Sequence, residues 1–401
     1  MNTDKALRRA LHSLPPTLFA TYERILDRVN ASSSDTQELV RRVLTWIVCT
    51  KRPLSTRELL EAVSINEGDT ERDEAAMPDE ESILKWCSSL VRRTPGGDRL
   101  ELAHFTVEEF LLAIDATEPN SRYARYRVSS NDQDLPLAKL CLTYLEFDDF
   151  SGEVWTGKGD FNECLEKYPL FDYASIFWSQ HAANFHHDEN LLDLVQILLD
   201  PAKTSNFLHL SHYWTWSGTS DDSITRTSNT ETLHFAANLS FHGICKWLID
   251  EKNRIGDLDK LTNFGTPLYC AIAGLQVFRN DSMPAKSSGA HPSPLPPPPP
   301  PLLGAKVYNA SSEDRQQTIK YLLDAGAAID NIKVHPDHDW SPLAAALELD
   351  SGWETLLERG AVLDGPTLDI AEDLIKNEVE QVADFLFAVT DDNLSDEIGP
   401  R

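Results

Sequence analysis

The sequence has few of the features that mark a secreted or membrane-bound protein. Its 401 residues contain six cysteines with no close spacing, a pattern too dispersed for a disulfide framework. The N-terminal residues lack the charged-then-apolar pattern of a signal peptide. No apolar run approaches the ~20 residues that a membrane helix needs. We therefore expect an intracellular, cytoplasmic protein without membrane contact, whose cysteines are mostly small buried side chains.

Positive charge is also scarce. The chain has 36 Lys and Arg against 64 Asp and Glu, a net charge of -28. Residues 1–128 hold 18 basic and 21 acidic residues, so a net charge of -25 falls on the remainder. A surface this acidic repels phosphate, which argues against nucleic acid as a partner of the C-terminal two thirds. A solvated surface is the simplest interpretation, and a basic partner is the functional one.

Patterns for catalysis, cofactors and metals are incomplete. The segment from Gly152 to Lys158 resembles a phosphate-binding P-loop, but Gly159 stands where a magnesium-binding hydroxyl is required. No Gly-x-Ser-x-Gly nucleophile elbow occurs. The histidine pairs 209/212 and 335/338 lack a third ligand at reliable spacing, so we expect solvated histidines there. The sequence thus predicts no catalytic residue, no cofactor and no metal, and a plain surface loop at 152–159.

The N-terminal third has the element order of a winged helix. Three helical patterns are followed by two short apolar runs around the turn Pro95-Gly-Gly-Asp98, which predicts a β-hairpin. Ser55-Thr-Arg-Glu58 and Thr106-Val-Glu-Glu109 each match a capping box at a helix start. Winged helices often bind DNA through the third helix, but here it begins with carboxylates and offers one lysine. Only Arg92 and Arg93 on the hairpin could contact phosphate.

Particular phrases in this region carry a family resemblance. They are Leu14-Pro-Pro-Thr-Leu18, Leu44-Thr-Trp46, Arg52-Pro-Leu54 and the run from Leu102 to Leu111. They resemble the winged-helix segment, named after a GPI inositol-deacylase, of fungal NACHT-ankyrin proteins, which are NLR-like signalling ATPases. The segments 138–145 and 168–181 resemble the helical spacer that follows in that family. In that family the NACHT ATPase lies upstream of the winged helix, so this chain would lack it.

His104 matches the junction histidine of that family's winged helix. In related signalling ATPases this histidine contacts the phosphate of the bound nucleotide. The resemblance therefore makes His104 a nucleotide sensor for an ATPase domain supplied in trans. The alternative, which we favour, is a partly buried and hydrogen-bonded histidine with no nucleotide to bind.

The last third repeats one phrase four times. The copies open at Glu231-Thr-Leu-His-Phe-Ala236, Thr266-Pro-Leu-Tyr-Cys-Ala271, Ser341-Pro-Leu-Ala344 and Thr367-Leu-Asp-Ile-Ala371. They resemble the ankyrin repeat, in which this phrase starts the first of two short helices. The resemblance implies that His234 braces the turn between repeats. Gly326 and Gly360 suit the left-handed end of each second helix. A repeat of this kind buries its apolar face only by stacking, which favours a solenoid that binds partners.

An insertion splits the second copy. It contains six consecutive prolines at 296–301, which force a polyproline II rod. The second helix of the split copy is expected to resume at Thr318. The rod could dock in a polyproline-binding domain, with Pro296, Pro298 and Pro300 as contacts. A neutral insertion tolerated in a loop is the alternative that we favour.

These patterns define an expected architecture. The fold class is mainly α: a winged helix with a small β-hairpin, a helical spacer and a degenerate ankyrin solenoid. The expected order is a linker helix (1–33), the winged helix (34–128), the spacer (129–228), the repeats (229–390) and an acidic tail (391–401). A proline-rich, disordered segment (278–314) interrupts the repeats.

The expected function is partner binding without catalysis. Protein partners would bind the concave face made by the turn tips and first helices, with Asn229, Phe264, Asp339 and Trp340 as contacts. One rival is a truncated NACHT-type ATPase whose nucleotide-binding domain is missing or supplied in trans. A second rival is a DNA-binding regulator acting through the winged helix.

Overall fold

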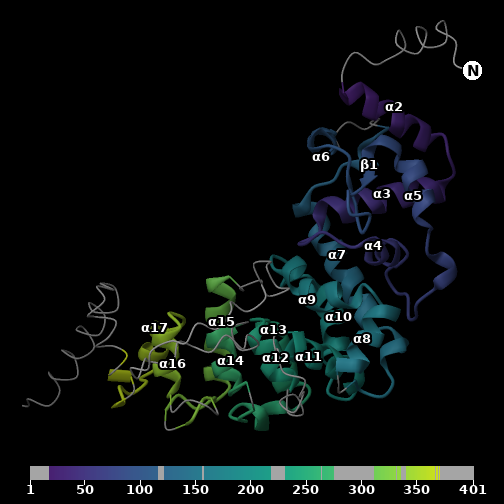
Figure 1. The fold of residues 1–401 in the computed structure, drawn as a ribbon. Coiled ribbons are helices and arrows are strands. Elements are labelled where there is room, and N and C mark those ends of the chain that lie inside the picture. Colours follow the sequence, from purple (N-terminus) through teal and green to yellow (C-terminus); the bar gives the residue numbers. More distant parts are fainter. Residues whose placement is uncertain are drawn as a thin grey trace, which may run out of the picture. The chain divides into compact units, whose positions relative to one another are not determined.

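The computed structural model shows a mainly helical chain with one small antiparallel sheet (Figure 1). The structure describes residues 18–115, 122–155, 158–217, 231–262, 264–274, 311–330, 332–335, 340–365, 367–368 and 370. The chain forms two compact units, an N-terminal unit (1–153 and 158–185) and a C-terminal unit (154–157 and 186–401). Within the described ranges, no helix is both long and apolar enough to cross a membrane.

The first part of the N-terminal unit has the predicted helices and hairpin. Its elements are α2 (Leu18–Asn30), α3 (Ser34–Cys49), α4 (Thr56–Ala62), η1 (Glu74–Ala76), α5 (Glu80–Cys87), η2 (Ser88–Leu90), β1 (Val91–Arg93), β2 (Leu100–Leu102) and α6 (Phe105–Ala113). Helix α3 is central, because α2, α4, α5 and β2 all pack against it. Its buried stripe includes Val40, Val43, Leu44 and Trp46, which follow helical spacing.

Local sequence signals set several of these helix starts. The Ser33 and Asp79 side chains accept backbone N–H bonds at the starts of α3 and α5. Ser55 and Glu58 form both halves of the predicted capping box at α4. This prediction is therefore confirmed in both of its hydrogen bonds.

The hairpin follows the predicted turn. Strands β1 and β2 pair with Val91 opposite Leu102 and Arg93 opposite Leu100. Gly97 takes a φ of +73°, a left-handed value that favours glycine in the connecting turn.

The capping box predicted at Thr106–Glu109 is wrong. Helix α6 begins at Phe105, two residues earlier than an N-cap at Thr106 requires, and His104 is its N-cap. The His104 imidazole accepts the N–H of Thr106, so it takes the place that the sequence pattern gave to the threonine hydroxyl.

A helical segment completes the N-terminal unit. It contains η3 (Ala124–Tyr126), α7 (Ser130–Leu145), η4 (Asp148–Phe150), α8 (Lys158–Lys167) and α9 (Phe171–Ala182). Helices α7 and α9 make the most extensive helix–helix contact in the molecule. Together, these two helices bury large aromatic side chains as well as several polar side chains.

The C-terminal unit continues with α10 (Glu189–Leu198) and α11 (Thr204–Ser217), followed in its described part by six helices in three pairs. The pairs are α12 (Thr232–Asn238) with α13 (His242–Asp250), α14 (Pro267–Ala273) with α15 (Ser312–Asp324), and α16 (Pro342–Glu348) with α17 (Trp353–Glu358). A 3₁₀ turn, η5 (Arg254–Asp257), lies between the first two pairs.

These pairs stack in two layers (Figure 1). Helix α14 packs between α12 and α16, and α15 packs between α13 and α17. Every residue of α12 and α14 is buried. Short helices of this kind do not fold alone, so stacking supplies their stability.

The predicted glycine ends are confirmed. Gly326 and Gly360 have φ values of +103° and +86°, and each follows the C-cap residue of its helix, Ala325 of α15 and Arg359 of α17. Ala327 and Ala361 donate backbone bonds to Leu322 and Leu356, which is the pattern of a Schellman motif. The same cap thus closes the second helix of two successive pairs.

One boundary differs from the expectation. Helix α15 starts at Ser312, earlier than Thr318 and inside the range predicted as a disordered insertion. The Ser311 hydroxyl caps the helix, and Arg315 donates to the carbonyl of Ile272. The first interaction closes the start of α15, and the second fixes its first turn against α14. The fourth predicted repeat beyond residue 370 and the proline run lie outside the described residues.

Candidate partner-binding site

The same kind of contact occurs at two successive junctions between helix pairs. The Asp259 carboxylate accepts the backbone N–H of Ala328 at 2.8 Å, and the Asp330 carboxylate accepts that of Val362 at 2.9 Å. Each aspartate belongs to the segment that follows one helix pair, and each N–H belongs to the segment after the next pair. We call these two contacts the aspartate ladder. They hold successive connecting segments at a fixed spacing along the stack.

His234 stabilises the first junction from inside. Its ring is buried, and its Nε2–H donates to the carbonyl of Lys260 at 2.8 Å. Burial lowers the pKa of His234 to about 4, although the bond to Lys260 opposes this shift. Neutral His234 therefore braces the connection between α13 and α14, as the resemblance implied.

A pocket of about 360 Å³ opens beside the last of these junctions. Its lining includes Asp330, Ile332, Lys333, Trp340, Val362 and Asp364. Trp340 is half-buried against a small core of Tyr269, Val334 and Ala345, so one part of its ring system is fixed and another is exposed. We call these lining residues the tip pocket.

The predicted contact residues have different outcomes. Trp340 lines the tip pocket. Phe264, expected to be exposed, is 93% buried, because its segment folds into the tight bridge between Thr262 and Gly265. Asn229, Asp339, Pro296, Pro298 and Pro300 lie outside the described residues.

Sequence reasoning missed Asp330 and Asp364. Their signal was present, since Gly326-Ala-Ala-Ile-Asp330 and Gly360-Ala-Val-Leu-Asp364 share one pattern. The glycine ends a helix, and the aspartate lies at the tip four residues later. Comparing successive copies position by position would have found both carboxylates.

The winged-helix surface has little charge to offer a phosphate. Arg93 pairs with Glu80 and Glu81 of α5, and Arg92 pairs with Glu101 across the hairpin. Glu80 and Glu81 also occupy the first turn of α5, the helix that reads DNA in other winged helices. The two hairpin arginines are thus already matched by carboxylates.

His104 is exposed, which corrects the expectation of partial burial. As an N-cap it uses Nδ1 for Thr106, whose hydroxyl also bonds the Tyr22 phenol at 2.7 Å. Its ring packs on Phe105 with a centroid separation of 4.2 Å. The capping position, at the start of α6, keeps the ring at the surface. These contacts explain the residue as a structural cap without a nucleotide.

A buried polar network joins distant parts of the N-terminal unit. The Tyr173 hydroxyl accepts from the Lys51 backbone and donates to His181 Nε2 at 2.8 Å. His181 Nδ1–H donates to Asp134 at 2.6 Å, and Lys51 Nζ reaches the same carboxylate at 2.8 Å. Burial lowers the pKa of His181. Burial would raise the pKa of Asp134, but hydrogen bonds from His181 and Lys51 lower it overall.

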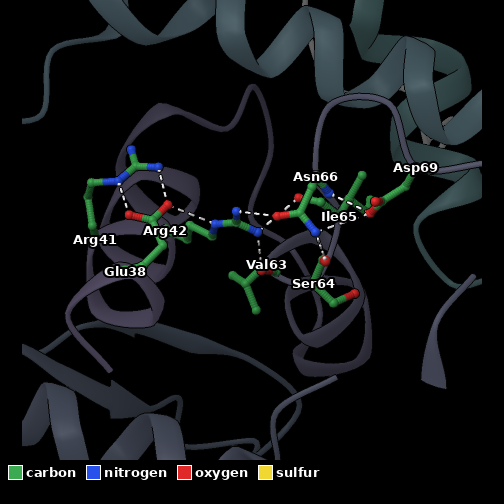
Figure 2. A network of polar contacts seen from close by, with 8 residues as sticks. All are labelled: Glu38, Arg41, Arg42, Val63, Ser64, Ile65, Asn66 and Asp69. Carbon is green, nitrogen blue, oxygen red and sulfur yellow. Dashed lines mark hydrogen bonds and ion pairs between the residues drawn. The ribbon is translucent and has the colours of Figure 1, made fainter. Parts of the chain in front are cut away.

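A second network fixes α3 to the segment after α4 (Figure 2). The Arg42 guanidinium donates to the carbonyls of Val63 and Ile65 and to the Asn66 amide oxygen. It also bonds Glu38, and the hydrogen bond from Arg41 holds the pKa of Glu38 at about 2, although burial opposes this shift. Arg42 therefore acts as a cap for the end of α4.

The remaining histidine and cysteine expectations can be assessed directly. All six cysteines are buried and free, as expected. Burial raises the pKa of Cys87 to about 12, so the thiol stays protonated and unreactive.

His209 and His212 are buried, so the prediction of solvated rings is wrong for this pair. In the other pair, His335 is half-buried and His338 lies outside the described residues. His212 bonds the Trp155 carbonyl and His209 packs on the Trp155 ring. Across the described residues, no group of three His, Cys, Asp or Glu side chains could hold a metal.

The segment that resembles a P-loop has a different context from a nucleotide site. It follows the 3₁₀ turn η4 instead of a parallel strand, and α8 begins at Lys158 itself. A P-loop requires a strand that leads into the loop and a helix that follows it.

Comparison with known proteins identifies one part of the chain. Residues 26–124 match the family model described as "GPI inositol-deacylase, winged helix domain". This range contains α3 to α6 and the hairpin, which agrees with the observed element order.

A relative from the fungus Monascus ruber, named "Azaphilone pigments biosynthesis cluster protein L", is 28% identical over 183 residues. The match covers 43% of this chain and 36% of that protein, so the chain aligns with about a third of the relative's length. No solved structure matches the chain.

Proposed function

We propose that the protein is a non-enzymatic scaffold whose stacked helix pairs are ankyrin repeats and whose tips bind a protein partner. The aspartate ladder is the observation that carries this proposal. At two successive junctions, an aspartate accepts a backbone N–H of the next connecting segment. A fold built by repeating one junction presents its connecting segments as a continuous surface, which suits binding of an extended partner.

The chemistry of the polar clusters supports binding over catalysis. The Tyr173–His181–Asp134 network is enclosed, with His181 1% exposed, so a substrate has no access to its proton relay. The cysteine thiols are protonated and buried. The tip pocket instead combines an aromatic ring, an aliphatic side chain and carboxylates at the surface, as partner-binding sites do.

Val362 offers a direct test. It is 62% exposed in the tip pocket, while its backbone N–H alone contributes to the aspartate ladder. Val362→Lys should therefore remove partner binding and leave the stack intact. Ile197→Lys, at an exposed aliphatic position on α10, is the matched control.

The experiment compares proteins that co-purify with the full chain and with each variant. A partner retained by the wild type and Ile197→Lys, lost with Val362→Lys, and rebound in purified form supports the proposal. Retention of every partner by Val362→Lys would contradict it. ATP hydrolysis by the purified full chain would contradict the absence of catalysis.

A further inference from the structure

The tip pocket holds two carboxylates in fixed orientations. Asp330 Oδ1 accepts the N–H of Val362 at 2.9 Å, and Asp364 Oδ1 accepts the N–H of Thr367 at 2.9 Å. The Thr367 hydroxyl donates to the same Asp364 oxygen. These donors are neutral groups, so they orient each carboxylate without neutralising its charge.

An aromatic side chain lies beside these carboxylates. Trp340 lines the same pocket and, like Ile332, packs against the buried cluster that contains Val334. An indole face attracts a cation that lies within about 6 Å of the ring, and tryptophan is the strongest of the aromatic side chains in this role. Carboxylates and an indole together form a site for an organic cation.

The surrounding charge favours the same ligand. Residues 311–365 contain nine acidic side chains against four basic ones among those described. Lys333 is the basic member of the pocket lining and opposes two carboxylates. An acidic field attracts basic partners and speeds their association.

The geometry points to a specific ligand class for the tip pocket: the Arg or Lys side chain of a partner peptide. Its cationic group would lie between Asp330 and Asp364, and its aliphatic stem would cover Trp340 and Val362. This inference rests on the proposed function and names the chemistry of the partner. An anionic side chain would meet two carboxylates, and a purely apolar one would bury both without compensation.

Peptide libraries can test this class directly. The probes are four sets of acetylated, amidated heptapeptides with three random uncharged residues on each side of a central Arg, Lys, citrulline or Glu. Retention on the immobilised full chain is measured for each set. We expect retention of the Arg and Lys sets to exceed that of the citrulline set by about tenfold, since citrulline keeps the shape of arginine without its charge.

Three variants locate the effect. Asp330→Asn with Asp364→Asn keeps an oxygen that accepts each backbone N–H, and it should abolish the preference for Arg and Lys. Lys333→Gln should increase retention of the Arg set severalfold, because it removes a competing cation from the lining. Asp324→Asn, an exposed carboxylate paired with Arg359 outside the pocket lining, should change nothing. Circular dichroism verifies that each variant is folded.

Each outcome has a distinct meaning. Equal retention of the Arg and citrulline sets, lost in Val362→Lys, would overturn the cation site and leave the scaffold function standing. A preference for Arg that persists in the double aspartate variant would place the cation elsewhere and also overturn it. Retention of all four sets that is unaffected by Val362→Lys would contradict the proposed function itself.

Discussion

The two units bury different kinds of polar side chain. The N-terminal unit buries three carboxylates, Glu58, Glu61 and Asp134, and pairs them with Arg52, Arg72 and Lys51. In the described part of the C-terminal unit, the buried polar side chains are only His, Ser, Thr and Asn. The first unit thus depends on ion pairs that join remote segments. The second depends on hydroxyl caps, one braced histidine and repeated backbone contacts.

This difference predicts different responses to mutation. Removing one partner of a buried ion pair leaves the other charge without compensation, so the damage is large and extends to every segment that the pair joins. In a stack of repeats each pair contacts only its neighbours, so damage at one junction stays near that junction. Substitutions chosen in each unit can therefore test the comparison.

The largest effect is expected from Asp134→Ala. It leaves the buried His181 and the half-buried Lys51 without their shared acceptor, and it should cost about 3 kcal/mol of the stability of the N-terminal unit. Hydrogen exchange followed by mass spectrometry should show faster exchange in α7 and α9 and unchanged exchange in α14 and α16. Asp132→Ala on the same helix removes an exposed pair with Arg127 and is the control. Equal exchange in both variants would show that the buried pair is not a main support of the unit.

A more local loss is expected from Gly265→Ala. Gly265 has a φ of +94°, and an added Cβ would lie 2.5 Å from the Val334 carbonyl oxygen and also against the Tyr269 ring. Strain and overlap together should cost about 3 kcal/mol. Gly326→Ala is the matched control, because its φ of +103° is equally left-handed but no atom lies within 4 Å of the added Cβ. It should cost about 1 kcal/mol.

Urea unfolding of the two glycine variants separates backbone strain from steric overlap. The difference between the urea concentrations at which the two variants are half unfolded measures the steric overlap alone. Equal midpoints would mean that the Val334 segment moves away at no cost, and that the tip is less rigid than its hydrogen bonds indicate.

Acid should destabilise the stacked helix pairs of the C-terminal unit through protonation of His234. Its folded pKa of about 4 lies below the ordinary value of 6.5, so the neutral ring stabilises the fold above pH 6.5. That stability is lost as the pH falls from 6.5 toward 4, because the unfolded state binds a proton first. Between pH 7 and pH 5 the loss should be about 2 kcal/mol. Buried Nδ1 has no partner among the described residues, so an added proton would have no acceptor.

His234→Gln isolates this effect. Glutamine keeps a donor for the Lys260 carbonyl but does not titrate between pH 5 and pH 7. The difference in free energy of unfolding between wild type and variant should therefore narrow as the pH falls. A constant difference across this range would show that His234 is not the titrating group.

The sequence predicted the structure best where a local pattern of residues is compatible with only one backbone arrangement. The hairpin, the Ser55–Glu58 box and the two glycine helix ends followed from residues within a few positions of each other. The box at Thr106 failed because His104, one position before the helix, competes for the same backbone donor. Helix α15 began early because Arg315 contacts a carbonyl 43 residues away, which no local pattern encodes.

The candidate site was less predictable than the fold. Trp340 was found from its place near a tip, but Phe264, at a similar position, is buried in a tight bridge. Which of two aromatic residues faces outward depends on how the tip closes, and that follows from tertiary contacts. The burial of His209 and His212 against Trp155 is a tertiary effect of the same kind.

The smallest effect is expected on the winged-helix surface. Because Arg92 and Arg93 are already paired with carboxylates, replacing both with Gln should not change the affinity for duplex DNA. Fluorescence anisotropy of a labelled duplex at low salt should show no binding by either protein. The complementary variant combines Glu80→Gln, Glu81→Gln and Glu101→Gln, which leaves the same arginines without their carboxylate partners. Weak, salt-sensitive DNA binding by this variant alone would show that the ion pairs prevent the arginines from binding DNA. Binding by the wild type that the arginine variant loses would contradict this view. It would show that phosphate can displace the paired carboxylates, and that the exposed ion pairs of this unit are weaker than its buried ones.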